Sequence, residues 1–278
     1  MTRIGVLHPG AMGSSIAAAL VAAGHQVFWL EPGRSEATRL RATQAGALPL
    51  ADESELAGLD AVVSVCPPDA ADALADTVKA TGFNGMFVDA NAVAPAKTQA
   101  IGNNLASAGC AFIDGGIIGP PAWQAGTTRL YLSGRDAESV AAWFAGSAVQ
   151  AQAISAEVGA ASALKMCYAA FTKGSSALLV AVRALAAAEG VQEQLLAEWE
   201  RSQPGLAARS AATASTVAGK GWRFVGEMRE IAATFESRGL PGGFHSAAAD
   251  LYQRLDQFKD APDADVEAVV AALLRTPG

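Results

Sequence analysis

Short apolar runs alternate with helix-like stretches over about the first 155 residues of the chain. The runs predict strands at residues 4–7, 27–30, 61–65, 86–89, 111–118, 130–133 and 148–153. The first four are apolar throughout, which is typical of strands covered on both faces. Helices are predicted at 14–23, 35–44, 69–79 and 95–108, because each stretch begins near Ser, Asp or Pro, residues that favour helix starts. This alternation predicts βαβ units and a doubly wound parallel sheet.

The strand pattern disappears after Val158, and the rest of the chain has helical patterns only. A long helix is predicted at 159–188, and shorter ones at 192–203, 207–218, 222–236, 245–255 and 264–274. Pro and Gly separate the shorter helices at 204–205, 239–243 and 261–262. We therefore expect two domains, an α/β domain at 1–156 and an all-α domain at 157–278, connected by the long helix.

Composition narrows the class of protein. With 51% hydrophobic and 17% charged residues among 278, the chain is too apolar to be disordered. The net charge of −7 disfavours nucleic acid as a partner. The three cysteines and three histidines have no paired spacing, which predicts no metal site and a reducing compartment. The apolar stretch at 177–188 is interrupted by Arg183 and is too short to span a membrane. We expect a soluble, cytoplasmic protein.

The segment at residues 5–13, GVLHPGAMG, follows a predicted strand and opens a predicted helix, as a dinucleotide-binding turn does. In such a Rossmann domain, Gly10 lets the backbone approach the pyrophosphate, and Gly13 lets the helix pack closely on the sheet. The helix start directs free N–H groups at the phosphates. His8 replaces the first glycine of the fingerprint and is a candidate contact to ribose or pyrophosphate. The candidate cofactor-binding residues of the turn are His8, Pro9, Gly10, Ala11, Met12 and Gly13.

The end of the second predicted strand carries conflicting signals for coenzyme choice. Glu31 lies 18 residues after Gly13, near the position where a carboxylate binds the ribose hydroxyls of NAD. Arg34 and Ser35, followed by Thr38, offer a guanidinium and hydroxyls that suit the 2′-phosphate of NADP. Because three groups converge on the second interpretation, we favour NADP and keep NAD as the alternative.

The chain resembles the β-hydroxyacid dehydrogenase superfamily, which includes 3-hydroxyisobutyrate and 6-phosphogluconate dehydrogenases and, more remotely, imine reductases. Residues 10–13 match its Gly-x-Met-Gly opening, and Val-Cys-Pro-Pro at 65–68 resembles its loop beside the nicotinamide. Residues 89–95 resemble its Asp-x-Ser-Thr-x-x-Pro segment, with asparagine in place of the serine. The resemblance covers nearly the whole chain. It implies cofactor contacts from Cys66, Pro67 and Asn91, and a substrate contact from Asn91.

Residues 114–121, DGGIIGPP, stand where this family has its substrate loop. Ile118 occupies the place of the serine that binds a substrate carboxylate. This version of the loop resembles a branch whose phosphogluconate-dehydrogenase-like C-terminal domain has unknown function, and also the loop of imine reductases. The resemblance implies substrate contacts from Ile118, Gly119 and Pro120, in a pocket made more apolar by the neighbouring Trp123.

The spacing from Gly159 to Lys165 matches the family's Gly-x5-Lys, which implies that Lys165 is the catalytic proton-transfer residue. Apolar neighbours on its helix disfavour the charged amine, which suits a general acid–base. The family's asparagine four residues later is Ala169 here. Tyr168, a candidate substrate-binding residue, and Lys173 are the alternatives for the missing polar contact.

The sequence thus predicts an NAD(P)-dependent oxidoreductase. The expected reaction is reversible hydride transfer between nicotinamide and a hydroxyl-bearing carbon or its carbonyl, with Lys165 as general acid–base. One alternative is reduction of a C=N bond, suggested by the apolar loop at 118–121. The other is a non-catalytic NAD(P)-binding sensor. The partners expected are a small-molecule substrate and a second copy of the chain, because helices of the C-terminal domain pair two subunits in this family.

Overall fold

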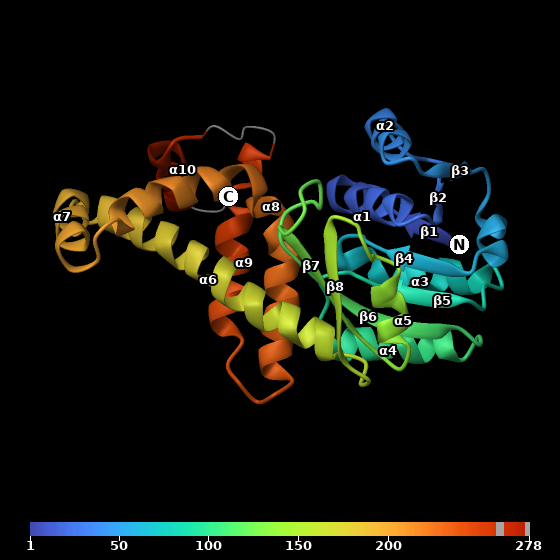
Figure 1. Ribbon diagram of the computed structural model, residues 1–278. Coiled ribbons are helices and arrows are strands. Elements are labelled where there is room, and N and C mark those ends of the chain that lie inside the picture. The colour runs from blue at the N-terminus through green and yellow to red at the C-terminus, as the bar shows by residue number, and fades with distance from the viewer. Residues whose placement is uncertain (260–263, 276–278) are drawn as a thin grey trace. The chain divides into compact units, whose positions relative to one another are not determined.

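The computed structural model describes residues 1–259 and 264–275. The chain divides into two compact units, Met1–Met166 and Cys167–Gly278. The division lies within one long helix, α6 (Ala160–Ala188), which begins in the first unit and continues in the second (Figure 1). The domain boundary predicted at residue 156 lies shortly before this helix.

The first unit is built on one sheet (Figure 1). Its strands are β1 (Arg3–Leu7), β2 (Gln26–Leu30), β3 (Leu48–Leu50), β4 (Ala61–Ser64), β5 (Met86–Asp89), β6 (Ala111–Ile118), β7 (Thr128–Ser133) and β8 (Val149–Ser155). Within the described residues their order is β3-β2-β1-β4-β5-β6-β7-β8. The order reverses direction at β1, which confirms the predicted doubly wound topology.

The sheet departs from the prediction at one end. Strands β1 to β6 are parallel, but β7 is antiparallel to β6, and β8 runs parallel to β7. The predicted parallel sheet is confirmed for β1 to β6, and the last two strands run in the opposite direction. The connection at 119–127 explains the reversal, since a parallel crossover needs about a dozen residues or more.

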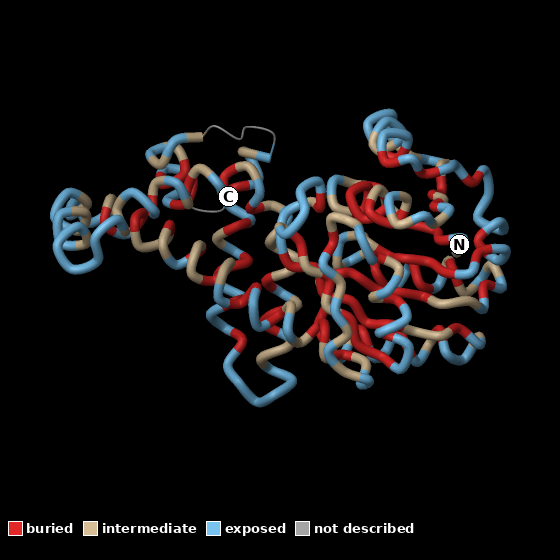
Figure 2. The backbone as a smooth tube through the Cα atoms, viewed as in Figure 1, coloured by how far each residue is buried: buried red, intermediate tan, exposed pale blue. Residues whose placement is uncertain are grey.

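Helices cover both faces of this sheet. They are α1 (Ala11–Ala22), α2 (Glu36–Gln44), α3 (Ala71–Ala80), α4 (Pro95–Ala106) and the short α5 (Ala137–Ala142). One core packs α1 and α5 against the sheet, with Ile16 and Leu20 buried on Ile4 and Val63. The other packs α3 and α4, with Val78 and Ile101 in one cluster with Val62 and Phe87. Figure 2 shows the central strands mostly buried, as expected for a covered sheet, whereas the edge strands β3 and β8 are only partly buried.

The four helices predicted in this unit are confirmed to within a few residues, but β3 and α5 were not predicted. Strand β3 has three residues, and the proline at its centre is a residue that disfavours strands. Helix α5 has six residues, fewer than two turns, which is too short for a periodic pattern.

The second unit consists of helices. After α6 come α7 (Gln192–Ser202), α8 (Leu206–Glu236), α9 (Gly243–Gln253) and α10 (Val266–Leu274). The two helices expected at 207–218 and 222–236 are one continuous helix, α8, so that prediction was wrong. The helix runs through Gly221, where a Cβ would lie 3.2 Å from Cδ1 of Tyr252 on α9. Close packing of α9 therefore outweighs the weak helix propensity of glycine. The Pro262 break lies outside the described residues.

Helix α6 is, among the described helices, the one with the length and hydropathy to cross a membrane. Of its most apolar stretch, 44% is buried within the protein. Buried Arg183 also interrupts the apolar stretch of this helix and donates to Ser210 Oγ at 2.9 Å. A buried core helix has the same composition, so this is weak evidence for a membrane span.

Candidate active site

The turn after β1 has the geometry of an anion-binding loop. The amide of Gly10 donates to the carbonyl of His8 at 2.7 Å. A Cβ on Gly13 would lie 2.4 Å from that same carbonyl oxygen, so only glycine fits there. Helix α1 begins at Ala11, directly after Gly10, and no side chain caps its N-terminus. Its first N–H groups are therefore available to a phosphate, as the sequence predicted.

The segment after β2 lies beside this turn and is rich in arginine. The carboxylate of Glu31 forms an ion pair with Arg39, with Oε1 and Nε 3.3 Å apart. The hydroxyl of Ser35 caps α2 by accepting from the amide of Thr38 at 3.3 Å. Arg41 Nε donates to the carbonyl of Pro9 at 3.3 Å and so connects α2 to the turn at residues 8–13, named the phosphate turn for its predicted role. Sequence reasoning missed Arg41, because this contact joins residues 32 positions apart.

A cavity of about 220 Å³ lies between the two segments. Apolar residues, among them Leu30 and Leu74, share its lining with His8 and Arg34. Nδ1 of His8 and Nε of Arg34 are buried and have no hydrogen-bond partner. Burial, and secondarily the Arg34 guanidinium, lower the pKa of His8 to about 4. With the glycine cradle beside it, this cavity suits the adenosine part of a dinucleotide: apolar walls for a base, and unused polar groups for its ribose.

Asn91 connects the ends of β4 and β5 at the same edge of the sheet. Its Oδ1 accepts from the Cys66 amide at 2.6 Å, and its Nδ2 donates to Ser64 Oγ at 2.8 Å. The residue is 4% exposed. Its amide therefore positions the loop that contains Cys66 and Pro67, while direct contact with nicotinamide or substrate stays a prediction. Burial raises the pKa of the Cys66 thiol to about 11, so the thiol stays neutral.

Two buried aspartates lie opposite each other on β5 and β6. Asp89 Oδ1 accepts from the Asn91 amide at 3.0 Å, but its Oδ2 has no partner. Burial raises the pKa of Asp89 to about 7, and the negative charge of Asp114 adds to this effect. No role was predicted for Asp89, because nothing in its local sequence pattern shows how deeply it is buried.

Asp114 holds the N-terminus of α6. Its Oδ2 accepts from the amides of Gly159 and Ser162, each at 3.0 Å, and from the Ser133 hydroxyl at 2.8 Å. Its Oδ1 accepts from the Ser162 hydroxyl at 2.5 Å. The carboxylate therefore satisfies helix N–H groups that have no partner within α6.

This anchoring brings Lys165 to the carboxyl end of β6. A Cβ on Gly116 would lie 2.7 Å from the Ala161 carbonyl and 3.1 Å from Lys165 Cβ, so the bare glycine lets α6 pack directly on β6. Lys165 is half-buried, and its Nζ donates to the carbonyl of Ile117 at 2.7 Å. Because β1, β4, β5 and β6 are parallel, the amine lies at the same edge of the sheet as the phosphate turn.

The loop after β6 is tightly folded. Gly119 has a φ of +130°, and a Cβ there would lie 2.3 Å from the Thr127 carbonyl. The Pro120 carbonyl accepts from Thr128 Oγ1 at 2.6 Å. Ile118 is buried, whereas Trp123 is exposed. The substrate contacts predicted for Ile118, Gly119 and Pro120 stay predictions.

The two remaining candidates belong to the second unit. Tyr168 is exposed on α6. Lys173 forms an ion pair with Glu227, and its Nζ lies 4.6 Å from the centre of the Phe224 ring. Lys173 is thus engaged within its own unit, in a contact that joins residues 54 positions apart and that the sequence pattern did not indicate.

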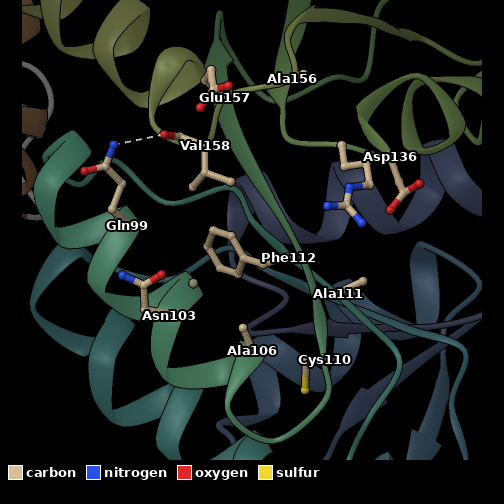
Figure 3. A pocket seen from close by; sticks show the side chains of 12 residues that line it. Gln99, Asn103, Ala106, Cys110, Ala111, Phe112, Asp136, Ala156, Glu157 and Val158 are labelled. Carbon is tan, nitrogen blue, oxygen red and sulfur yellow. Dashed lines mark hydrogen bonds between the residues drawn. The ribbon is translucent and has the colours of Figure 1, made fainter.

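A second cavity of the first unit, of about 800 Å³, lies away from these residues (Figure 3). It occupies the opposite edge of the sheet, at the start of β6 and the ends of β7 and β8. Phe112 is central to it, and Gln99 Nε2 donates to the Val158 carbonyl at 3.1 Å at its side. None of the predicted site residues lines this cavity.

Comparisons with known proteins agree with this geometry. Residues 3–144, about half of the chain, match the NAD binding domain of 6-phosphogluconate dehydrogenase. Residues 186–255 match a domain of unknown function, DUF1932. No curated protein matched the chain.

Solved structures similar to this chain span nearly all of it. A conserved hypothetical protein from Sinorhizobium meliloti is 28% identical, with a TM-score of 0.71 and 98% of this chain and 96% of that chain covered. The 3-hydroxyisobutyrate dehydrogenase of Mycobacterium tuberculosis, solved with L-serine, is 20% identical, with a TM-score of 0.71 and coverages of 99% and 100%. An imine reductase variant from Myxococcus stipitatus, solved with NAD⁺, is 19% identical, with a TM-score of 0.57 and coverages of 99% and 100%.

The family match confirms the resemblance seen in the sequence, and the strand–turn–helix geometry of β1 and α1 agrees with it. The chain therefore belongs to the family of NAD(P)-binding oxidoreductases defined by the NAD binding domain of 6-phosphogluconate dehydrogenase.

Proposed function

We propose that this protein catalyses reversible hydride transfer between a nicotinamide coenzyme and a hydroxyl-bearing carbon or its carbonyl, with Lys165 as general acid–base. The observation that carries the proposal is the position of the Lys165 amine, which lies at the same edge of the sheet as the phosphate turn and donates to Ile117 at 2.7 Å. Open α/β sheets bind their ligands at this edge, near the point where the strand order reverses.

In this proposal Lys165 Nζ gives its proton to the developing alkoxide during reduction and removes the hydroxyl proton during oxidation. Gly116 and Asp114 hold the first turns of α6 so that the amine stays at the carboxyl end of β6. Bound coenzyme supplies the hydride or accepts it. The Lys165–Ile117 hydrogen bond orients the amine before a substrate arrives, which lowers the cost of reaching the reactive geometry.

We further propose that the coenzyme is NADP(H). Arg34 lines the adenosine cavity with Nε unpaired, and the hydroxyl of Ser35 lies at the start of α2. The carboxylate of Glu31, which would favour NAD, is already engaged by Arg39. A 2′-phosphate therefore meets more positive than negative charge in this region.

We also propose a homodimer formed through helices of the second unit. Phe171, Leu178 and Leu185 of α6 are exposed and follow one another at intervals of seven residues. Apolar residues at this spacing form a seam that another helix covers. Analytical ultracentrifugation tests the proposal, and a chain that stays monomeric at micromolar concentration contradicts it.

The test of the catalytic proposal compares the wild type with Lys165→Met and Lys165→Arg. A panel of hydroxyacids, aldehydes, ketones and cyclic imines is followed at the nicotinamide absorbance with both coenzymes. We expect carbonyl reduction by the wild type, a loss of kcat of at least 100-fold in Lys165→Met, and unchanged Kd for coenzyme. Turnover of imines alone favours C=N reduction, which the apolar loop at 118–121 suggested. Coenzyme binding without any turnover favours a sensor.

A further inference from the structure

His8 has a backbone conformation that residues other than glycine adopt only rarely. Its φ is +64°, and among the described residues it is the one non-glycine residue with a positive φ. Glycine adopts this conformation freely, whereas a side chain makes it strained. A strained residue at a position where glycine fits without cost indicates that its side chain contributes something to function.

The His8 side chain faces a region where hydrogen-bond donors are in excess. It lines the 220 Å³ cavity with Arg34 from the segment after β2, Glu53 from the 3₁₀ turn at Glu53–Gly58, and Thr77 from α3. Arg34 can only donate hydrogen bonds, and its Nε has no partner. Glu53 is the one acidic residue in this lining. Glu31, the other carboxylate near the strand end, is paired with Arg39.

The imidazole is neutral at physiological pH, because burial and then Arg34 lower the pKa of His8 to about 4. A neutral imidazole has one N–H donor and one nitrogen acceptor. Nδ1 has no partner in the structure. Because a buried N–H without a partner is rarer than a buried acceptor without one, the proton is assigned to Nε2, and Nε2–H is the donor that remains for a ligand. His8 Nε2–H and Arg34 Nε–H are then two hydrogen-bond donors at the same cavity, and together they suit a ligand group that has acceptors only. A phosphate is such a group, whereas a ribose hydroxyl both donates and accepts.

We propose that His8 is a specificity-determining residue that, together with Arg34, favours dinucleotides with a phosphate on the adenosine 2′-oxygen. This inference rests on the proposed function, since it assumes that the turn after β1 binds a nicotinamide dinucleotide. The inference goes beyond the proposed function because it assigns the preference for NADPH over NADH to His8, the residue that replaces the family's first glycine.

The experiment measures Kd for NADPH and NADH by calorimetry with no substrate present. It compares the wild type with His8→Gly and His8→Asn. Both replacements tolerate a positive φ, so neither disturbs the turn. We expect His8→Gly to weaken NADPH binding at least tenfold and NADH binding less than threefold, with a Tm equal to or above that of the wild type. His8→Asn retains an amide donor and should lose less NADPH affinity than His8→Gly.

The outcomes separate the inference from the proposed function. Equal weakening of both coenzymes, no weakening of either, or a wild type that prefers NADH each overturns the role of His8 and leaves coenzyme binding intact. A wild type that binds neither coenzyme overturns the proposed function, and this inference with it. A lower Tm in His8→Gly contradicts the strain on which the argument begins.

Discussion

The helices α1 and α6 begin in the same unit, but the free N–H groups at their N-termini differ. Those of α1 have no side-chain partner, whereas those of α6 have one. At α1 no side chain caps the helix, and the glycine cradle leaves the amides open to a ligand. At α6 the Asp114 carboxylate fills the equivalent position and accepts hydrogen bonds from two backbone amides and two hydroxyls. An open helix N-terminus binds an external anion, whereas one filled by an internal carboxylate fixes the helix in place. The first arrangement suits coenzyme binding, and the second suits the positioning of Lys165.

Removal of the internal anion should have the largest effect on stability. Asp114→Ala leaves buried donors of Gly159, Ser162 and Ser133 without their acceptor. Because each unsatisfied buried group costs about 1–3 kcal/mol, we expect the free energy of unfolding to fall by at least about 3 kcal/mol. Urea denaturation followed by circular dichroism measures it. The control is Asp136→Ala, since Asp136 is exposed and its side chain does not cap α5. A similar loss in both variants would mean that Asp114 does not anchor α6.

Blocking the open N-terminus should act on coenzyme affinity. A Cβ at Gly13 would lie 2.4 Å from the His8 carbonyl, so Gly13→Ala must displace the turn. We expect Kd for NADPH to rise at least tenfold, which is about 1.4 kcal/mol. Gly243→Ala serves as the control, because a Cβ there meets no atom within 4 Å and its φ is not positive. Fluorescence titration with NADPH gives both constants, and an unaltered Kd in Gly13→Ala contradicts the phosphate turn.

Asp89 can be compared with Asp114, because it is also a buried carboxyl but lacks the several hydrogen-bond donors that surround Asp114. Its pKa is raised to about 7 by burial, against an ordinary value near 3.8. Between these values the folded state holds a proton that the unfolded state has lost, so stability falls as pH rises from about 4 to 7. Asp89→Asn removes this dependence, and we expect it to gain about 1 kcal/mol or more on the wild type between pH 5 and pH 8.

Thermal unfolding at pH 5, 6, 7 and 8 tests the behaviour of Asp89. The exposed Asp136→Asn is the control and should follow the wild type. If Asp89→Asn and the wild type keep a constant difference in Tm across this range, Asp89 does not titrate between pH 5 and pH 8, and the pKa of about 7 is wrong.

The sequence determined those parts of the fold that depend on neighbours along the chain. The apolar run before His8 and the glycines after it define a strand, a turn and a helix, because all three follow from side-chain size and backbone freedom within about ten residues. Pro95 and Ser35 likewise mark the starts of α4 and α2. The spacing from Gly159 to Lys165 was predictable for the same reason, since Gly159 directly precedes the helix that contains Lys165.

Only the tertiary structure decided which polar groups meet. Asp114 and Ser162 are 48 positions apart, and Asn91 and Ser64 are 27 apart. The sequence pattern also did not indicate the orientation of β7, the continuity of α8 through Gly221 or the contact of Arg41 with the phosphate turn. Contacts of this kind depend on the packing of whole elements, and no local pattern records which side chains that packing brings within hydrogen-bond distance.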